Sequence, residues 1–232
     1  MTIVLLAYVA AAVLPALFLM WYIYKHDKIE KEPLPLLMKL ILSGVYSAFL
    51  AILLETIGQS VLDSAGFTSE SKYIIWTAIM VGLSEEISKF IFLYLRSWKT
   101  PHFNYRYDGI VYAVFVSLGF AAFENIKYVF YYGLSVAPSR ALLAVPAHMA
   151  FGVFMGSFYG WAKINDVYGQ TGKAVMQLIF GVLSAAAFHA FYDACAMLGT
   201  EEAMMVFIVF VIIMYIVVIH KVKREANTDM EI

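Results

Sequence analysis

Charged residues are scarce in this sequence of 232 residues. Asp, Glu, Lys and Arg make up 14% of the chain, whereas a soluble domain carries about a quarter. The shortage excludes an ordinary soluble domain, and the 62% of hydrophobic residues indicates an integral membrane protein instead. The chain also lacks a basic stripe interleaved with aromatic residues, so we expect no nucleic-acid partner.

Cysteine and the common catalytic motifs are almost absent as well. The single cysteine, Cys195, excludes an internal disulfide framework. The sequence contains no serine nucleophile elbow, no His-Glu-x-x-His helix and no P-loop. It has no repeat of fixed period and no low-complexity segment. We therefore expect a single integral-membrane domain over residues 1–232.

Long apolar runs account for most of the chain, and each is near the 20 residues that a helix needs to cross a bilayer. They predict an all-α, polytopic transmembrane bundle of about seven spans. The spans are expected at residues 3–24, 36–61, 73–95, 108–132, 140–162, 174–198 and 203–220.

The basic residues of the loops predict the orientation of this bundle. Eleven Lys and Arg residues lie in one set of alternate loops, and only Lys72 and Arg140 lie in the other set. Because loops rich in Lys and Arg stay in the cytoplasm, we expect the N-terminus outside and the C-terminus in the cytoplasm.

The third run, residues 73–95, carries Glu85, Glu86 and Lys89 near its middle. Each such charge costs roughly 2.5–3.5 kcal/mol at the centre of a membrane helix. The spacings of three and four place Lys89 on one face with the two carboxylates. A structural ion pair of Glu85 with Lys89 is one interpretation, but one ammonium cannot neutralise two carboxylates. The run therefore predicts a polar cavity between helices.

The fourth run carries Glu124 and Tyr128 in a stripe with the small residues Ser117 and Ala121. Small residues let a neighbouring helix approach, and the two larger side chains then present polar atoms to it. Lys127, one turn from Glu124, is the expected local partner of its carboxylate. The simpler interpretation is an interhelical hydrogen bond without chemistry.

The fifth and sixth runs each add an imidazole. His148 is followed by glycines at 152, 156 and 160, a spacing of small residues that predicts a close-packing face directed into the bundle. His189 and Asp193 are four residues apart, so Asp193 can fix the tautomer of the histidine. Each could also be a satisfied structural group, and Cys195, away from the His189 face, is assigned to packing.

These groups permit three kinds of chemistry. A glutamate could deprotonate a water that one histidine orients, while the second histidine stabilises an oxyanion. A divalent metal such as zinc could bind among Glu86, Glu124, His148 and His189, with Glu86 as the base. The same residues could also form the proton relay of a proton- or metal-coupled transporter, although the chain shows no related halves of the kind common in transporters.

Four short motifs on successive runs resemble the PrsW-type intramembrane proteases. They are Glu-Glu-x-x-Lys from Glu85, Phe-Glu-x-x-x-Tyr from Phe123, the lone His148, and His-x-x-x-Asp from His189. The resemblance extends over residues 20–198, and places the chain in the wider superfamily of CAAX prenyl endopeptidases and bacteriocin-immunity proteases.

The chain departs from the CAAX enzymes at two of these motifs. Those enzymes have Glu-Glu-x-x-x-Arg, whereas Lys89 lies one position earlier here. They also have Phe-x-x-x-His, whereas Ala144 stands four residues before His148. Both differences argue against a prenylated substrate.

The resemblance implies a hydrolase that cleaves single-span membrane proteins, notably anti-sigma factors in a site-1-type cleavage during stress signalling. It implies a multi-pass protein in the bilayer of a bacterial or archaeal cell membrane. The expected catalytic residues are Glu85 or Glu86 together with His148, and the expected further site residues are Glu124, His189 and Asp193, supported by Lys89 and Tyr128.

Overall fold

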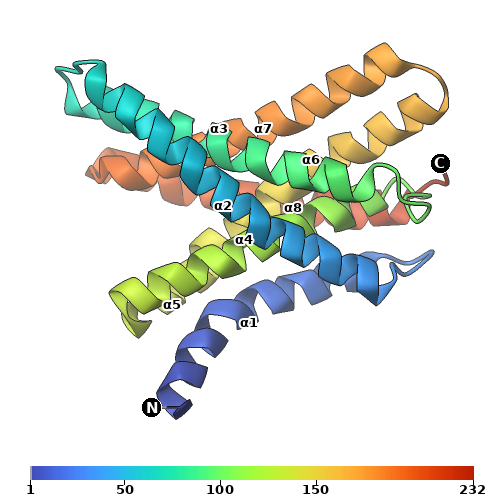
Figure 1. The fold of residues 1–232 in the computed structure, drawn as a ribbon, viewed down its shortest axis with the longest axis horizontal. Helices are drawn as coiled ribbons and strands as arrows, with labels where there is room; N and C mark the ends of the chain where they lie inside the picture. Colours follow the sequence, from blue (N-terminus) through green and yellow to red (C-terminus); the bar gives the residue numbers. More distant parts are fainter. Residues whose placement is uncertain (1) are drawn as a thin grey trace.

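The computed structural model describes residues 2–232, and within them seven long helices are joined by short connections (Figure 1). The long helices are α1 Thr2–His26, α2 Leu34–Ser64, α3 Glu70–Ser97, α4 Asp108–Tyr132, α6 Val145–Val167, α7 Thr171–Leu198 and α8 Glu201–Asn227. The turn before α6 contains η1 Leu134–Val136, α5 Ala137–Ser139 and the π-helical η2 Arg140–Ala144. This architecture confirms the predicted all-α bundle. Most helices extend beyond the apolar runs, and α8 continues to Asn227 rather than His220.

Six of the long helices are apolar enough to cross a membrane by length and composition. The exception is α3, because Glu85, Glu86 and Lys89 lie near its centre. Its 28 residues correspond to a length of roughly 42 Å, more than a hydrocarbon core of about 30 Å requires. The seven-span topology and its orientation remain predictions.

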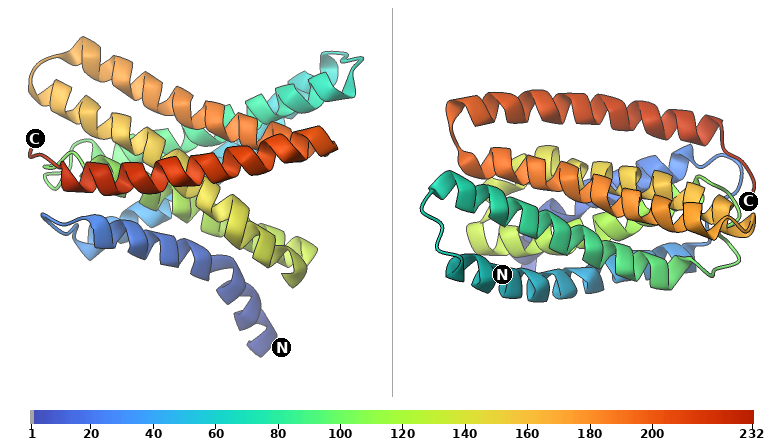
Figure 2. Two further views of the ribbon diagram at one scale, coloured as in Figure 1. Left: turned by 180° about the vertical axis from the view of Figure 1, so that it is seen from behind. Right: turned by 90° about the horizontal axis from the view of Figure 1, so that it is seen from above.

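Helix α4 lies at the centre of the bundle, between α1, α2 and α6 (Figure 1). Every residue from Asp108 to Ala121 is buried, which explains why this helix is apolar on all sides. Helix α7 packs between α3 and α6, and α8 forms an outer layer over α6 and α7 (Figure 2). The segments that carry the candidate residues therefore adjoin one another.

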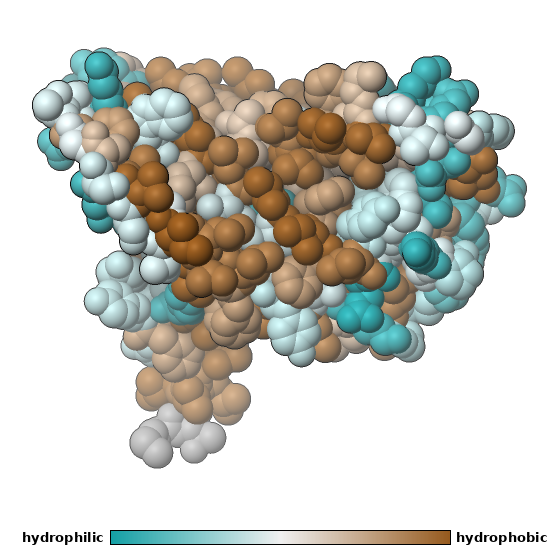
Figure 3. Space-filling view, turned by 45° about the horizontal axis from the view of Figure 1, so that its top comes forward, coloured by the Kyte–Doolittle hydropathy of each residue, from teal (hydrophilic) through white to brown (hydrophobic). Residues whose placement is uncertain are grey.

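Large apolar side chains cover the outward faces of α1, α2, α7 and α8. In the space-filling view they form a brown belt, with hydrophilic residues gathered at the two ends of the molecule (Figure 3). So large an exposed apolar surface is not tolerated in water and suits contact with lipid tails. The chain is thus a multi-pass membrane protein.

Glycines bring helix backbones into contact at two positions that define the site. A Cβ at Gly156 of α6 would lie 2.5 Å from the carbonyl oxygen of Gly109 in α4. A Cβ at Gly82 of α3 would lie 2.9 Å from the carbonyl oxygen of Ala186 in α7. The close-packing face predicted after His148 is therefore present, and the α3–α7 crossing lies one turn from Glu85 and Glu86.

Three connecting segments meet at one end of the bundle. Asn104 donates to Glu30 of the α1–α2 linker over 2.8 Å, and Lys28 donates to Asn227 over the same distance. Tyr105 and Glu231 form a β-bridge. These are the basic segments that the charge pattern assigns to one side of the membrane, and the α2–α3 connection lies at the opposite end (Figure 1).

The topology can be tested by single-cysteine labelling, because Cys195 is buried. Ala65 and His102 are both exposed, one in each connection that flanks α3. We expect an impermeant thiol reagent to label Ala65→Cys on intact cells, and to label His102→Cys only after permeabilisation. Labelling of both from the same side would contradict a spanning α3, and the unsubstituted chain is the control for Cys195.

Two carboxylic acids of the α1–α2 linker are unexpectedly buried. Asp27 is 2% exposed and Glu32 is 6% exposed. Glu32 accepts a hydrogen bond from the Tyr112 hydroxyl over 2.8 Å, while its second oxygen and one oxygen of Asp27 have no partner among the described residues. Burial raises the pKa of Asp27 to about 6 and the pKa of Glu32 to about 7, with Lys31 opposing the shift at Asp27.

These shifts predict that the linker loosens at neutral pH. Because both folded-state pKa values lie above the ordinary values of 3.8 and 4.5, the docked linker binds more protons than the unfolded chain. The resulting stability is fully present below the ordinary values and is lost as the pH rises through 6 and 7. We expect the thermal unfolding midpoint in detergent to fall from about pH 5 to about pH 8. Glu32→Gln should reduce this slope, and Glu202→Gln, at an exposed position at the start of α8 remote from the linker, should not.

Candidate active site

The side chain of Lys89 lies at the centre of the polar cluster. Its ammonium donates to Glu85 Oε2 over 2.9 Å, to Glu86 Oε1 over 2.7 Å and to His148 Nδ1 over 3.1 Å. It also lies 4.1 Å from the centre of the Phe120 ring. An ammonium has three N–H donors, so all three are used, and Lys89 is 1% exposed. Both ion pairs allowed by the sequence spacing are therefore formed.

The contacts of His148 define its tautomer. Because an ammonium can only donate, Nδ1 of His148 must accept, and the ring proton is on Nε2. That nitrogen faces Glu124 Oε2 at 3.2 Å. The same carboxylate oxygen accepts from the Arg140 guanidinium over 2.7 Å, and Arg140 also donates to Asn125 over 2.6 Å. The expectation that Lys127 is the partner of Glu124 is wrong: the ion pair is made with Arg140, which returns from the turn after α4.

His189 contributes from the opposite side of the cluster. Its Nδ1 donates to Glu86 Oε1 over 2.9 Å, and its Nε2 lies 3.5 Å from Asp193 Oδ2. The ring stacks on Phe151 with centroids 4.7 Å apart and lies 5.3 Å from the His148 ring. The structure thus brings the two histidines and their carboxylates together from α3, α4, α6 and α7.

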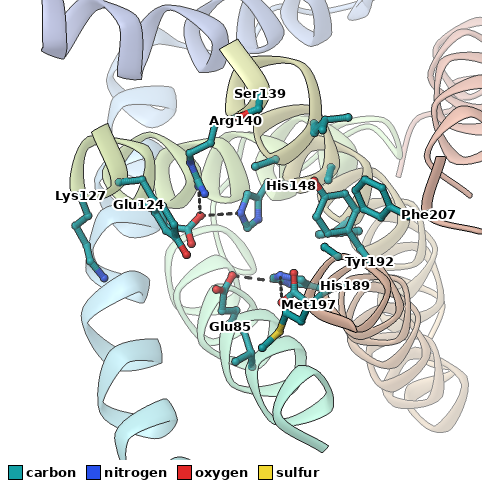
Figure 4. A pocket seen from close by; sticks show the side chains of 18 of the residues that line it. Glu85, Glu124, Lys127, Ser139, Arg140, His148, His189, Tyr192, Met197 and Phe207 are labelled. Carbon is teal, nitrogen blue, oxygen red and sulfur yellow. Dashed lines mark hydrogen bonds and ion pairs between the residues drawn. The ribbon is translucent and has the colours of Figure 1, made fainter. Parts of the chain in front are cut away.

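A cavity of about 630 Å³ adjoins this cluster. Its polar lining includes Glu85, Glu124, His148, His189 and Asp193 (Figure 4). Glu86 and Lys89 are not part of the lining, and Glu86 is 0% exposed. Of the two adjacent glutamates, only Glu85 therefore faces the space where a substrate could enter.

The remaining walls show where the cavity opens. They include Tyr128 near the end of α4, Arg140, Met197 at the end of α7 and Met204 at the start of α8. All of these residues lie toward the end of the bundle away from the basic segments. Tyr128 is 37% exposed, and its ring lies 3.8 Å from the Arg140 guanidinium carbon. Tyr128 thus supports Arg140 at the rim rather than joining the histidines.

Comparison with known proteins identifies the family. The sequence model of the PrsW family intramembrane metalloproteases matches residues 32–219. The chain is 32% identical to Protease PrsW of Halalkalibacterium halodurans over 219 residues, covering 94% of this chain and 97% of that protein. It is 31% identical to Protease PrsW of Clostridioides difficile over 225 residues, covering 95% of this chain and 92% of that protein.

This chain belongs to the PrsW family of intramembrane proteases. A third relative, Protease PrsW of Bacillus subtilis, is 31% identical over 187 residues, or 81% of each chain. No solved structure matches. Membership confirms the resemblance drawn from the four motifs, and makes the protein a membrane-embedded hydrolase rather than the transporter that was the alternative.

The family description includes a metal, and the donor types of the cluster suit one. Ligand atoms of Glu85, Glu86, His148 and His189 all lie within 4.8 Å of one another, and carboxylates with imidazoles are common zinc ligands. The lone pairs of these ligand atoms, however, are already engaged in hydrogen bonds within the cluster. The ammonium of Lys89 contacts three of the four donors, and Nδ1 of His189 carries the proton that it gives to Glu86. As arranged, these residues do not fit a metal ion.

Glu124, which the sequence placed among the candidate metal ligands, lies outside this four-residue group. Its carboxylate is occupied by Arg140 and His148. Its place in the site is to accept the Nε2 proton of His148, and this fixes the orientation of the imidazole.

Arg140 is the site residue that sequence reasoning missed, since it was counted only as a loop charge. Two signals could have revealed it: it is an isolated basic residue at the start of an apolar run, and it shortly precedes Pro146. Proline has no N–H, so the carbonyl of Leu142 loses its helical donor. The chain forms the π-helical turn η2 here, and the Tyr215 hydroxyl from α8 donates toward the carbonyls of Leu142 and Leu143.

Replacement of Arg140 should weaken the fold measurably. Arg140→Gln removes the charged partner of Glu124, and we expect the free energy of unfolding to fall by roughly 1.5–3 kcal/mol. Arg140→Lys keeps the charge but cannot reach both Glu124 and Asn125, so its loss should be smaller. Equilibrium unfolding in detergent measures both. Lys127→Gln is the matched control. If Lys127→Gln lowers the free energy of unfolding as much as Arg140→Gln does, Lys127 is the partner of Glu124 after all.

Proposed function

We propose that this protein is an endopeptidase that hydrolyses a peptide bond of single-span membrane proteins with a water activated by a carboxylate. The observation that carries the proposal is the single cavity onto which Glu85, His148 and His189 all open. General base catalysis requires the base within hydrogen-bonding reach of the attacking water, and a cavity of this size holds both a water and an extended peptide segment.

Glu85 is the proposed general base. It lines the cavity, whereas Glu86 is fully buried behind it and holds Lys89 and His189. Glu85 Oε2 accepts from Lys89, and its Oε1 makes no hydrogen bond within residues 2–232. Glu85 therefore has an oxygen available for a water, which leaves Glu86 as the residue that positions its neighbours.

The reaction follows from these positions. Glu85 takes a proton from the water as its oxygen attacks the scissile carbonyl carbon. His189 acts in this step as an imidazolium with a proton on each nitrogen, since the carboxylates of Glu86 and Asp193 face its two nitrogens. Its Nε2 donates to the carbonyl oxygen as negative charge develops there, because the contact of Nε2 with Asp193 at 3.5 Å is loose. Collapse of this intermediate breaks the C–N bond, and Glu85 returns the proton to the leaving nitrogen. His148, whose two nitrogens are engaged by Lys89 and Glu124, forms the facing wall of the water site.

The opening of the cavity supports cleavage near the outer face of the membrane. It lies at the end of the bundle that the charge pattern places outside. A substrate with one span would then present the peptide just beyond its helix, consistent with a site-1-type cleavage. On the resemblance of the motifs we propose an anti-sigma factor as the substrate class and the bacterial or archaeal cell membrane as the location.

The two glutamates should respond differently to substitution. Glu85→Gln keeps the shape of the side chain but removes the base, so we expect a loss of ~10²–10⁴-fold in the rate of cleavage with little change in stability. Glu86→Gln should instead lower the unfolding midpoint, because it weakens the anchor of Lys89 and His189. Cleavage of purified single-span proteins in proteoliposomes and thermal unfolding in detergent measure the two effects.

Glu55→Gln is the matched control for Glu85→Gln, since Glu55 lines the same cavity from α2 without contacting a histidine. It should retain most activity. Wild-type turnover by Glu85→Gln would refute the assignment of the base. Addition of a chelator should leave the rate of cleavage unchanged. Loss of cleavage on addition of the chelator would refute the metal-free mechanism.

A further inference from the structure

We infer that Lys89 is a built-in counter-cation that occupies the place of a metal ion, so that the cluster takes up a divalent cation only when the ammonium is removed. The inference concerns cation binding, and it stands whether or not Glu85 is the catalytic base.

The position of the ammonium carries the first step. Its nitrogen lies 2.7–3.1 Å from one atom each of Glu85, Glu86 and His148. A zinc ion bound to these atoms would lie about 2.0–2.2 Å from each of them. The two cations would therefore need the same space, and Lys89 is 1% exposed, with the Phe120 ring against it. The ammonium therefore already fills the position that a zinc ion would take.

The charge of the cluster gives the second step. Two adjacent buried carboxylates require compensation, and Lys89 pairs with both Glu85 and Glu86 and supplies one positive charge. His189 adds an N–H to Glu86 from the other side. A divalent ion beside the ammonium would bring two further positive charges into a buried site. A divalent ion in place of the ammonium would meet the same two carboxylates with a matching charge.

The lone pairs give the third step. Without the ammonium, Glu85 Oε2 and His148 Nδ1 lose their donor, and Glu86 Oε1 keeps only the N–H of His189, which leaves it a lone pair for a metal ion. Three protein ligands with one open position is the usual arrangement of a catalytic zinc site. His189 lies within the same 4.8 Å group and could become the fourth ligand. Removal of one side chain should thus convert an ion-pair cluster into a zinc site.

The experiment measures zinc binding rather than activity. The purified protein is loaded with zinc in detergent, dialysed and analysed for metal, and the thermal unfolding midpoint is recorded with zinc or with a chelator. For the unsubstituted chain we expect no stoichiometric zinc bound through His148. We also expect zinc to leave its unfolding midpoint unchanged. For Lys89→Met we expect about one zinc ion per chain and a midpoint that zinc raises, as a ligand specific to the folded state must do.

Three further variants make the result specific. Lys89→Arg keeps a buried cation and should still exclude zinc. Lys163→Met removes an ammonium that donates to the Trp98 carbonyl far from these ligands, and should create no zinc site. Lys89→Met combined with His148→Ala should lose the zinc that Lys89→Met gained.

A folding failure of Lys89→Met does not end the test. The double variant Lys89→Met with Glu85→Gln carries one fewer uncompensated carboxylate, keeps Glu86, His148 and His189 as ligands, and is expressed with zinc in the medium. Zinc bound by either variant supports the inference. Stoichiometric zinc in the unsubstituted chain that is lost with His148→Ala would overturn it, and so would the absence of zinc from both the single and the double variant.

Discussion

The ion-pair cluster around Lys89 is the constraint on which the rest of the structure depends. Two carboxylates and an ammonium near the middle of a membrane helix are costly unless they are enclosed and paired. Helix α3 can carry them because α2, α4 and α7 pack around it, and because Gly82 lets α7 approach to backbone contact. His148 and His189 then complete the enclosure from two different helices. The packing of the bundle and the composition of the site therefore depend on each other.

Each imidazole of the cluster is held by at least one residue from another helix. His148 of α6 is fixed by Lys89 of α3 and Glu124 of α4, and Glu124 is fixed by Arg140 from the turn before α6. Glu86 of α3 fixes His189 of α7. Such interlocking keeps the imidazoles oriented before a substrate arrives, and preorganisation of this kind is a major source of catalytic power.

The sequence predicted the helices and the gathering of the polar groups, because hydrophobic runs and buried charges follow directly from the physics of the bilayer. It did not predict which basic residue pairs with Glu124. Whether Arg140 rather than Lys127 reaches this carboxylate depends on how the turn after α4 folds back. It could not rank Glu85 against Glu86, because adjacent positions on a helix differ only by the neighbours packed on each. The burial of Glu32 was equally hidden, since that depends on the docking of a linker on Tyr112.

The cavity is closed on the side opposite its opening. Beyond Lys89 the bundle is filled by α4 and by an aromatic cluster in which Trp98 and Phe103 pack on the Tyr159 ring at centroid distances of 5.1 and 5.2 Å. This packing closes the route to Glu85 from the end of the bundle that carries the basic segments. Such one-sided access suits hydrolysis, which must supply a single water and release two peptide ends without opening a path for ions. A proton-coupled transporter would have to expose the same carboxylates alternately to both sides, and the fully buried Glu86 and Lys89 form the barrier that prevents this.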